Sequence, residues 1–169
     1  MKNTFIRYSC LVLSLAVMTF IFIMSHQPAD VSTAQSGGFI EFAAKVLLND
    51  FEELSAEQQE EIIISYQLLA RKAAHFSVYM ALAFLLSGFF HSFKCLEKAC
   101  GYIFAFLIAF VFSCSDEIHQ YFIPGRSCQV SDVLLDASGM IFGILVFIIF
   151  TLLIKRFRGV SSGENEIQQ

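Results

Sequence analysis

Four long apolar segments restrict the fold of this chain more than any other feature of its sequence. They run over about residues 8–24, 73–93, 101–122 and 132–154. Each segment is close to the ~20 residues that a helix needs to cross ~30 Å of hydrocarbon. Hydrophobic residues make up 56% of the chain, whereas ~45–50% is usual in soluble domains. These observations predict an integral membrane protein.

The apolar segments are continuous, which distinguishes helices from the strands of a membrane barrel. Barrel strands alternate apolar and polar residues, and these segments do not. We predict an all-α fold, a four-helix transmembrane bundle over residues 1–158 with a polar cytoplasmic tail at 159–169. The first segment could be a signal peptide, because Lys2 and Arg7 precede it. No A-x-A-like cleavage site follows, which favours an uncleaved membrane anchor.

The loop between the first and second segments has a helical pattern of its own. Its apolar residues recur at helical spacing opposite Glu41 and Lys45; they are Phe39, Phe42, Ala43, Val46 and Leu47. This pattern is typical of a short amphipathic helix on a membrane surface, and a lid is the open alternative. Ser55 and Gln58 match a capping box, which predicts a second helix that continues into the next span.

The lysines and arginines predict the orientation of the bundle. Four spans place Lys2, Arg7, Lys94, Lys98, Lys155, Arg156 and Arg158 on one side, and Lys45, Arg71, Lys72 and Arg126 on the other. The positive-inside rule assigns the first set to the cytoplasm. We therefore expect a multi-pass plasma-membrane protein with both termini cytoplasmic and the second set facing outward.

The remaining composition excludes several classes of site. Five cysteines are an odd number that cannot form a complete disulfide framework, so we expect all five to be unpaired. The net charge of −4 and the acidic outer loop argue against a nucleic-acid partner. The tight H-E-x-x-H spacing, the phosphate-loop motif and the G-x-S-x-G motif are missing. We predict neither a metal nor a cofactor.

The third apolar segment ends in the sequence DEIHQYFIPGR, residues 116–126. Only about 14 residues precede these acids, and at 1.5 Å per residue they cover ~20 Å. Asp116, Glu117 and His119 must therefore help to complete the span. Ionisable groups at this depth face a protein interior or a wet cavity, and their usual role is functional.

Candidate partners for these acids lie on the same side of the neighbouring segments. Residues 71 and 75 share one helix face, as do residues 132 and 136, and Gly139-x-x-x-Gly143 allows close helix packing beside them. We predict an outward polar pocket framed by the second, third and fourth spans. Its candidate catalytic residues are Glu117, His75, Asp116 and His119; its candidate ligand-binding residues are Arg71, Lys72, Gln120, Arg126, Asp132 and Asp136. Ion pairs that only fix the helix register are the structural alternative.

Four stretches of the sequence together resemble the VanZ-like family. They are SHQP after the first span, RKAAHFSVY in the second, DEIHQYFIPGR closing the third and SDVLLDASG opening the fourth. The resemblance covers almost the whole chain and implies a bacterial plasma-membrane protein, similar to one implicated in lowered sensitivity to the glycopeptide teicoplanin. The family has no established biochemical activity. Asp136 stands where family members often carry Asn.

Three functions are compatible with the predicted pocket. The first is binding or modulation of an outer-leaflet envelope lipid, a lipid-linked wall precursor or a glycopeptide, with Arg71, Lys72 and Arg126 holding phosphate or carboxylate. The second is a membrane-embedded enzyme that uses Glu117 or Asp116 with a histidine in acid–base chemistry. The third is a small proton-coupled transporter, although no inverted repeat is visible.

Overall fold

The fold was examined in a computed structural model that describes residues 2–48, 50–93 and 96–167. Side chains are described for residues 4–29, 37–38, 40–48, 50–93 and 96–157. The predictions that involve Lys2, Phe39, Lys94, Cys95, Arg158 and the side chains of the 159–169 tail lie outside these residues.

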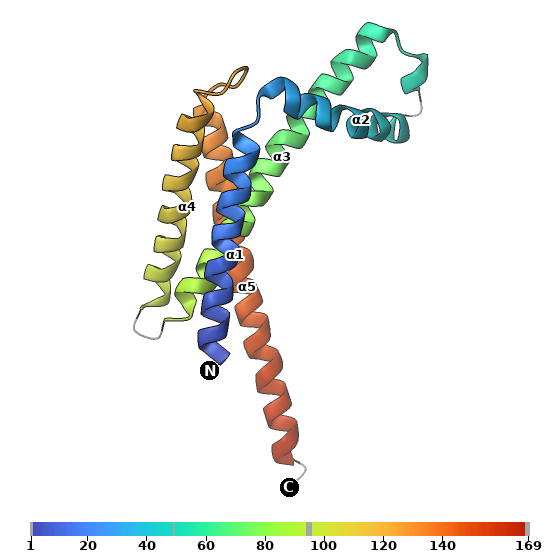
Figure 1. The fold of residues 1–169 in the computed structure, drawn as a ribbon. Coiled ribbons are helices and arrows are strands. Elements are labelled where there is room, and N and C mark those ends of the chain that lie inside the picture. The colour runs from blue at the N-terminus through green and yellow to red at the C-terminus, as the bar shows by residue number, and fades with distance from the viewer. Residues whose placement is uncertain (1, 49, 94–95, 168–169) are drawn as a thin grey trace.

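The described chain is helical, and its helices form a bundle (Figure 1). The elements are α1 (Lys2–Ser25), α2 (Ala29–Leu47), the 3-10 turn η1 (Phe51–Glu53), α3 (Ala56–His91), α4 (Lys98–Gln120) and α5 (Val130–Ile167). Four of them, α1, α3, α4 and α5, are long and apolar enough to cross a membrane. Helix α3 packs against each of the other three spans and against α2. The predicted all-α bundle with four spans is confirmed.

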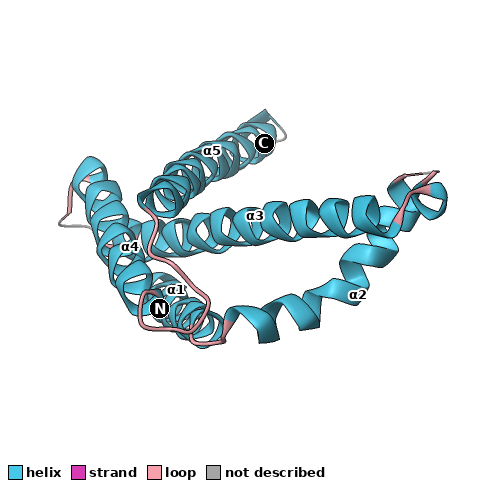
Figure 2. Ribbon diagram, turned by 90° about the horizontal axis from the view of Figure 1, so that it is seen from above, coloured by secondary structure: helices cyan, strands magenta, loops and turns pink. Residues whose placement is uncertain are grey.

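Helix α3 is longer than the membrane is thick. Its 36 residues extend over ~54 Å at 1.5 Å per residue, against ~30 Å of hydrocarbon. It begins at the predicted capping box, in which Ser55 Oγ accepts a hydrogen bond from the backbone N–H of Gln58 and the Gln58 side chain accepts one from the Ser55 N–H. The N-terminal part of α3 therefore projects from the bundle, where α2 runs beside it (Figure 2).

Helix α2 confirms the predicted helix between the first two spans. Ile40 and Ala44 are buried one turn apart, whereas Phe42 and Val46 are exposed. Lys45 donates to Glu41 across one helical turn at 3.0 Å. One face of α2 is thus packed within the protein and another presents apolar side chains to the surroundings. The location of that second face on a membrane surface stays a prediction.

Two glycines bring α5 into direct contact with the backbone of α3. A Cβ added at Gly139 would lie 2.5 Å from the carbonyl oxygen of Phe76, and one added at Gly143 would lie closer still to that of Met80. Small residues at a four-residue spacing permit this approach between membrane helices. The predicted packing role of Gly139-x-x-x-Gly143 is therefore confirmed.

The core of the bundle lies between α3 and its neighbours. Tyr79 and Leu82 of α3 are fully buried, and they meet the small side chains Ala105 and Ala109 of α4. The described cysteines, at positions 10, 100, 114 and 128, are free, as predicted. Arg7 of α1 donates a hydrogen bond to Ser92 Oγ, at the C-terminal end of α3, at 3.0 Å.

We expect Gly139→Ala to destabilise the bundle because the new methyl group collides with backbone that cannot rotate away. Overpacking of this kind typically costs about 1–3 kcal/mol. The matched control is Gly38→Ala on α2, where an added Cβ meets nothing within 4 Å. Thermal unfolding of the purified protein in detergent micelles measures both. Equal midpoints for Gly139→Ala and the unchanged protein would contradict the close packing.

Candidate functional site

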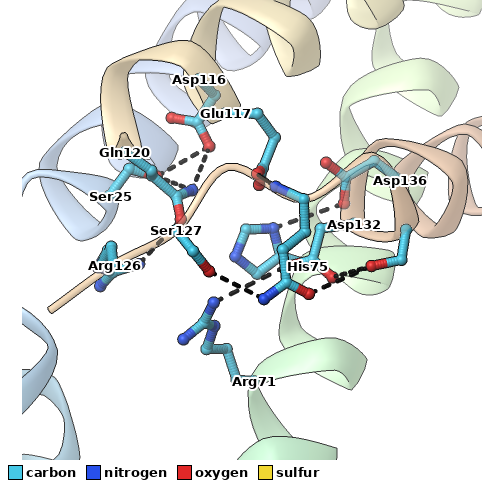
Figure 3. Close-up of polar contacts among 12 residues, drawn as sticks. Ser25, Arg71, His75, Asp116, Glu117, Gln120, Arg126, Ser127, Asp132 and Asp136 are labelled. Carbon is cyan, nitrogen blue, oxygen red and sulfur yellow. Dashed lines mark hydrogen bonds and ion pairs between the residues drawn. The ribbon is translucent and has the colours of Figure 1, made fainter. Parts of the chain in front are cut away.

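The polar cluster of the bundle forms where α3, α4 and α5 meet the loop that follows α4 (Figure 3). Four carboxylates are buried there: Asp116 and Glu117 from α4, and Asp132 and Asp136 from α5. The backbone N–H of Gln129, in that loop, donates to Glu117 Oε2 at 3.0 Å. A buried charge is costly without a partner, so the contacts of these carboxylates define the architecture of the site.

Helical periodicity explains why these side chains converge. On α4, Ser113, Asp116, Glu117 and Gln120 are spaced at i, i+3, i+4 and i+7 and are all buried, which places them on one face. Asp132, Asp136 and Gly139 follow the same rule on α5. Because Gly139 lies against the backbone of α3, the two aspartates on its face are carried to the α3 side of the helix.

Asp116 is held by neutral donors from two helices. Its Oδ2 accepts hydrogen bonds from Ser25 Oγ of α1 at 2.9 Å and from Gln120 Nε2 at 3.0 Å. Gln120 in turn accepts from Arg126 Nη1 through Oε1, at 3.4 Å. Asp116 and Arg126 are therefore linked through one amide side chain.

The aspartates of α5 lie behind two basic residues of α3. Arg71 Nη2 is 3.8 Å from Asp132 Oδ2, and His75 Nδ1 is 3.5 Å from Asp136 Oδ1. The other oxygen of Asp136 accepts a hydrogen bond from Ser113 Oγ at 2.7 Å. The two bases are one helical turn apart, and so are the two acids, so the pairs stack along the α3–α5 interface.

Arg126 differs from Arg71 and His75 because no carboxylate lies within ion-pair distance of its guanidinium group among the described residues. It donates to two backbone carbonyls at the end of α1, those of Gln27 at 2.8 Å and Met24 at 3.1 Å. Burial lowers the pKa of its guanidinium from the ordinary value, and repulsion from Arg71 lowers it further. The group still stays charged at neutral pH.

A groove of about 700 Å³ opens between α1 and α3 beside this cluster. Its polar lining consists of Ser25, Gln27, Arg71, His75, Arg126 and, further along α3, Gln67. Most of its remaining wall is apolar, with Phe20, Ile21 and Met24 from α1 and Ile64, Leu68 and Val78 from α3. The groove thus combines a basic end with a hydrocarbon-like wall.

The charges of the site are arranged in two layers. The three bases Arg71, His75 and Arg126 line the groove. The four carboxylates do not line it; they lie behind the bases and are buried. Such an arrangement stabilises the bases in an apolar environment, and it leaves the guanidinium donors of Arg71 and Arg126 beside the groove, where an anion can accept hydrogen bonds from them.

The structure brings together most of the predicted site residues but leaves two apart. Lys72 is exposed on α3. His119 stacks on Phe22 with ring centroids 4.9 Å apart, and its Nε2 lies 3.3 Å from His26 Nδ1. It therefore pairs with the end of α1 and not with the carboxylates. Glu117 and Asp116 belong to the cluster but do not face the groove.

The groove also differs in position from the predicted pocket. It lies between the first and second spans, whereas the pocket was predicted between the second, third and fourth. The reason is packing. Gly139 and Gly143 bring α5 into backbone contact with α3, so no groove opens between these two helices at the glycines. Helix α1 belongs to the site as well, because Ser25 donates a hydrogen bond to Asp116. Sequence reasoning missed Gln27 and Ser113. The polar SHQP exit from the first span was the available signal for Ser25 and Gln27.

Within the described residues, no group of three or more His, Cys, Asp or Glu side chains is arranged to hold a metal ion.

A family model described as VanZ/LLP1 matches residues 10–151 of the chain. The matched region includes the central part of each of the four spans and every residue of the polar cluster. No curated protein and no solved structure matches the chain.

We expect Ser113→Ala to destabilise the protein because it removes a donor from the buried carboxylate of Asp136. A hydrogen bond to a charged group is worth about 1.5–3 kcal/mol. Ser77→Ala is the control, since the exposed Ser77 hydroxyl only donates to the Ala73 carbonyl within its own helix. The two unfolding midpoints in detergent are compared. Loss of similar size in both variants would show that Ser113 contributes nothing specific to Asp136.

Proposed function

We propose, from the premise that the chain belongs to the VanZ/LLP1 family, that it is a bacterial envelope protein that binds an anionic amphiphile in the groove between α1 and α3. The basic end holds the anionic head group, and the apolar wall holds part of an acyl or polyprenyl chain. The protein thereby binds or modulates an outer-leaflet lipid, a lipid-linked wall precursor or a lipid-bearing glycopeptide.

One observation carries this proposal: Arg71, His75 and Arg126 line the same groove as a set of apolar side chains from α1 and α3. Two guanidinium groups that repel each other gain energy when an anion lies between them, and the gain is large where water is scarce. Planar guanidinium groups also match the oxygens of phosphate and carboxylate. A neutral lipid would use the apolar wall but would bring no anionic group to the two guanidinium groups.

The resemblance to a teicoplanin-related protein extends the proposal to one further ligand. A glycopeptide with a lipid tail has the same two parts, a polar body with carboxylate and an acyl chain. The groove would take the tail and the carboxylate as it takes a lipid. Lowered sensitivity to teicoplanin then follows from competition or sequestration at the outer leaflet.

The proposed orientation has both termini in the cytoplasm and the groove at the outer side of the membrane. Lys98, Lys155 and Arg156 at the other end of the bundle support it through the positive-inside rule. A location of α2 on the membrane surface would agree with the same orientation, because Phe42 and Val46 are exposed on this helix and α2 packs against α3.

Arg126→Gln and Arg71→Gln should each weaken binding of dioctanoyl phosphatidylglycerol by about tenfold or more, because a charge-assisted hydrogen bond to the ligand is lost. Native mass spectrometry of the purified protein with added lipid measures the bound fraction. Lys72→Gln removes the same charge from an exposed position beside Arg71 and is expected to leave binding within about twofold, since rim charges contribute little.

Two comparisons decide the outcome of that experiment. Dioctanoyl phosphatidylcholine should bind more weakly than phosphatidylglycerol to the unchanged protein. Teicoplanin should displace phosphatidylglycerol if it shares the groove. Equal losses in Lys72→Gln and Arg126→Gln would show general electrostatic attraction and would remove the support for a specific site.

The orientation can be tested with the chain's own cysteines. Cys128 is exposed in the loop that carries Arg126, whereas Cys100 is half-buried at the other end of α4. A membrane-impermeant maleimide added to intact cells should label the protein, and Cys128→Ser should abolish that labelling. Labelling that persists in Cys128→Ser would contradict the proposed topology.

A further inference from the structure

His75 has a more specific environment than an anion-binding residue requires. Its ring lines the groove, yet its Nδ1 atom is buried and points to Asp136 Oδ1 at 3.5 Å. Neither of these two atoms has a hydrogen-bond partner elsewhere among the described residues. We therefore pair Nδ1 of His75 with Oδ1 of Asp136, the carboxylate oxygen that lies 3.5 Å from it.

This pairing determines which nitrogen of His75 carries the proton. A carboxylate accepts only, so the proton lies on Nδ1 and the lone pair is on Nε2. Ser113 donates to the other oxygen of Asp136 at 2.7 Å and holds the carboxylate in place. With the proton on Nδ1, Nε2 is the ring nitrogen that is left to act as a base or nucleophile, and His75 is one of the residues that line the groove.

The two arginines line the same groove as His75, and their guanidinium groups can bind the oxygens of a phosphoryl group there. Arg71 is one helical turn before His75 on the same face of α3, and Arg126 lines the same groove from the loop after α4. Phosphoryl transfer depends chiefly on positioning and on neutralising the oxygens of the transferred group. A histidine flanked by two guanidinium groups meets both requirements.

The groove also restricts the leaving group. Among its described lining residues, His75 is the side chain whose ordinary pKa lies near neutrality, and a second proton donor for an alcohol is not among them. A phosphate leaving group needs no such donor, because its own conjugate acid has a pKa of about 6. The site therefore suits an anhydride better than a simple ester.

We propose that His75 hydrolyses the terminal phosphoanhydride bond of a lipid diphosphate bound in the groove. This inference rests on the proposed function. Nε2 attacks the terminal phosphorus and forms an N–P bond, while the bridging P–O bond breaks and its electron pair stays on the lipid monophosphate. Asp136 stabilises the resulting positive ring through the Nδ1–H. Water then attacks the phosphorus, the N–P electron pair returns to Nε2, and inorganic phosphate leaves with the proton of water going to solvent.

The full-length protein in detergent micelles can be tested with farnesyl diphosphate, a short lipid diphosphate. Colorimetric assay of inorganic phosphate should show release by the unchanged protein and a loss of about 100-fold or more in His75→Gln, in the range for a group that acts in the transition state. His91→Gln is the matched control, because it changes a histidine at the opposite end of the same helix and should retain full release.

Asp136 is a positioning residue in this scheme, and conservative rescue distinguishes that role from a structural one. Asp136→Asn keeps an oxygen that accepts from Nδ1–H and should retain release within about tenfold. Asp136→Leu removes the acceptor and should reduce release about 100-fold. Terminally ³²P-labelled substrate, quenched in base, should leave label on residue 75 of the unchanged protein.

The outcomes separate this inference from the proposed function. Binding of phosphatidylglycerol without any release of phosphate would overturn the hydrolase and leave the binding site standing. Failure of both binding and release would overturn both. Release that survives in His75→Gln, or label that maps to another residue, would overturn the role of His75 even if the protein hydrolyses the lipid.

Discussion

The close contact between α3 and α5 is the constraint on which the polar end of this protein depends. Gly139 and Gly143 let the α3 backbone approach at Phe76 and Met80, and the first of these contacts is at the residue next to His75. The helices can then place Asp132 and Asp136 directly behind Arg71 and His75. Any larger side chain at the glycines would separate the acids from the bases, and each would be left as an unpaired charge in a low-dielectric interior.

The buried carboxylates are best understood as support for the bases that line the groove. Taken alone, four acids would repel an anionic ligand. In the bundle, Asp132 and Asp136 are opposite Arg71 and His75, Asp116 accepts from Ser25 and Gln120, and Glu117 accepts from the Gln129 backbone. The part of the cluster that lines the groove is thus basic, although the cluster as a whole is rich in acid. Arg126 donates to two backbone carbonyls and not to a carboxylate, so its positive charge is available to an anionic ligand.

Most of the fold could be predicted from local patterns. The four spans follow from segment length and hydropathy, and the start of α3 follows from the Ser55–Gln58 capping box, because both depend on residues that are near one another in sequence. The packing role of Gly139 and Gly143 was also predictable from their spacing. The site was predictable in part. Eight of the ten predicted residues converge in the polar cluster; they are Arg71, His75, Asp116, Glu117, Gln120, Arg126, Asp132 and Asp136. The other two, Lys72 and His119, lie apart from this cluster. Adjacent positions on a helix point in different directions, so Lys72 could not share the environment of Arg71.

The sequence by itself determined the number of helices, the faces on which their polar residues lie and the end of the bundle where those faces meet. These properties follow from periodicity and from the length of chain that a membrane requires. Only the tertiary structure decided that the open groove lies between α1 and α3, that His119 stacks with His26, and that bases line the groove while acids lie behind them. Those features depend on how far each helix is rotated about its axis and on which neighbour fills each gap, and pairwise packing between distant segments sets both.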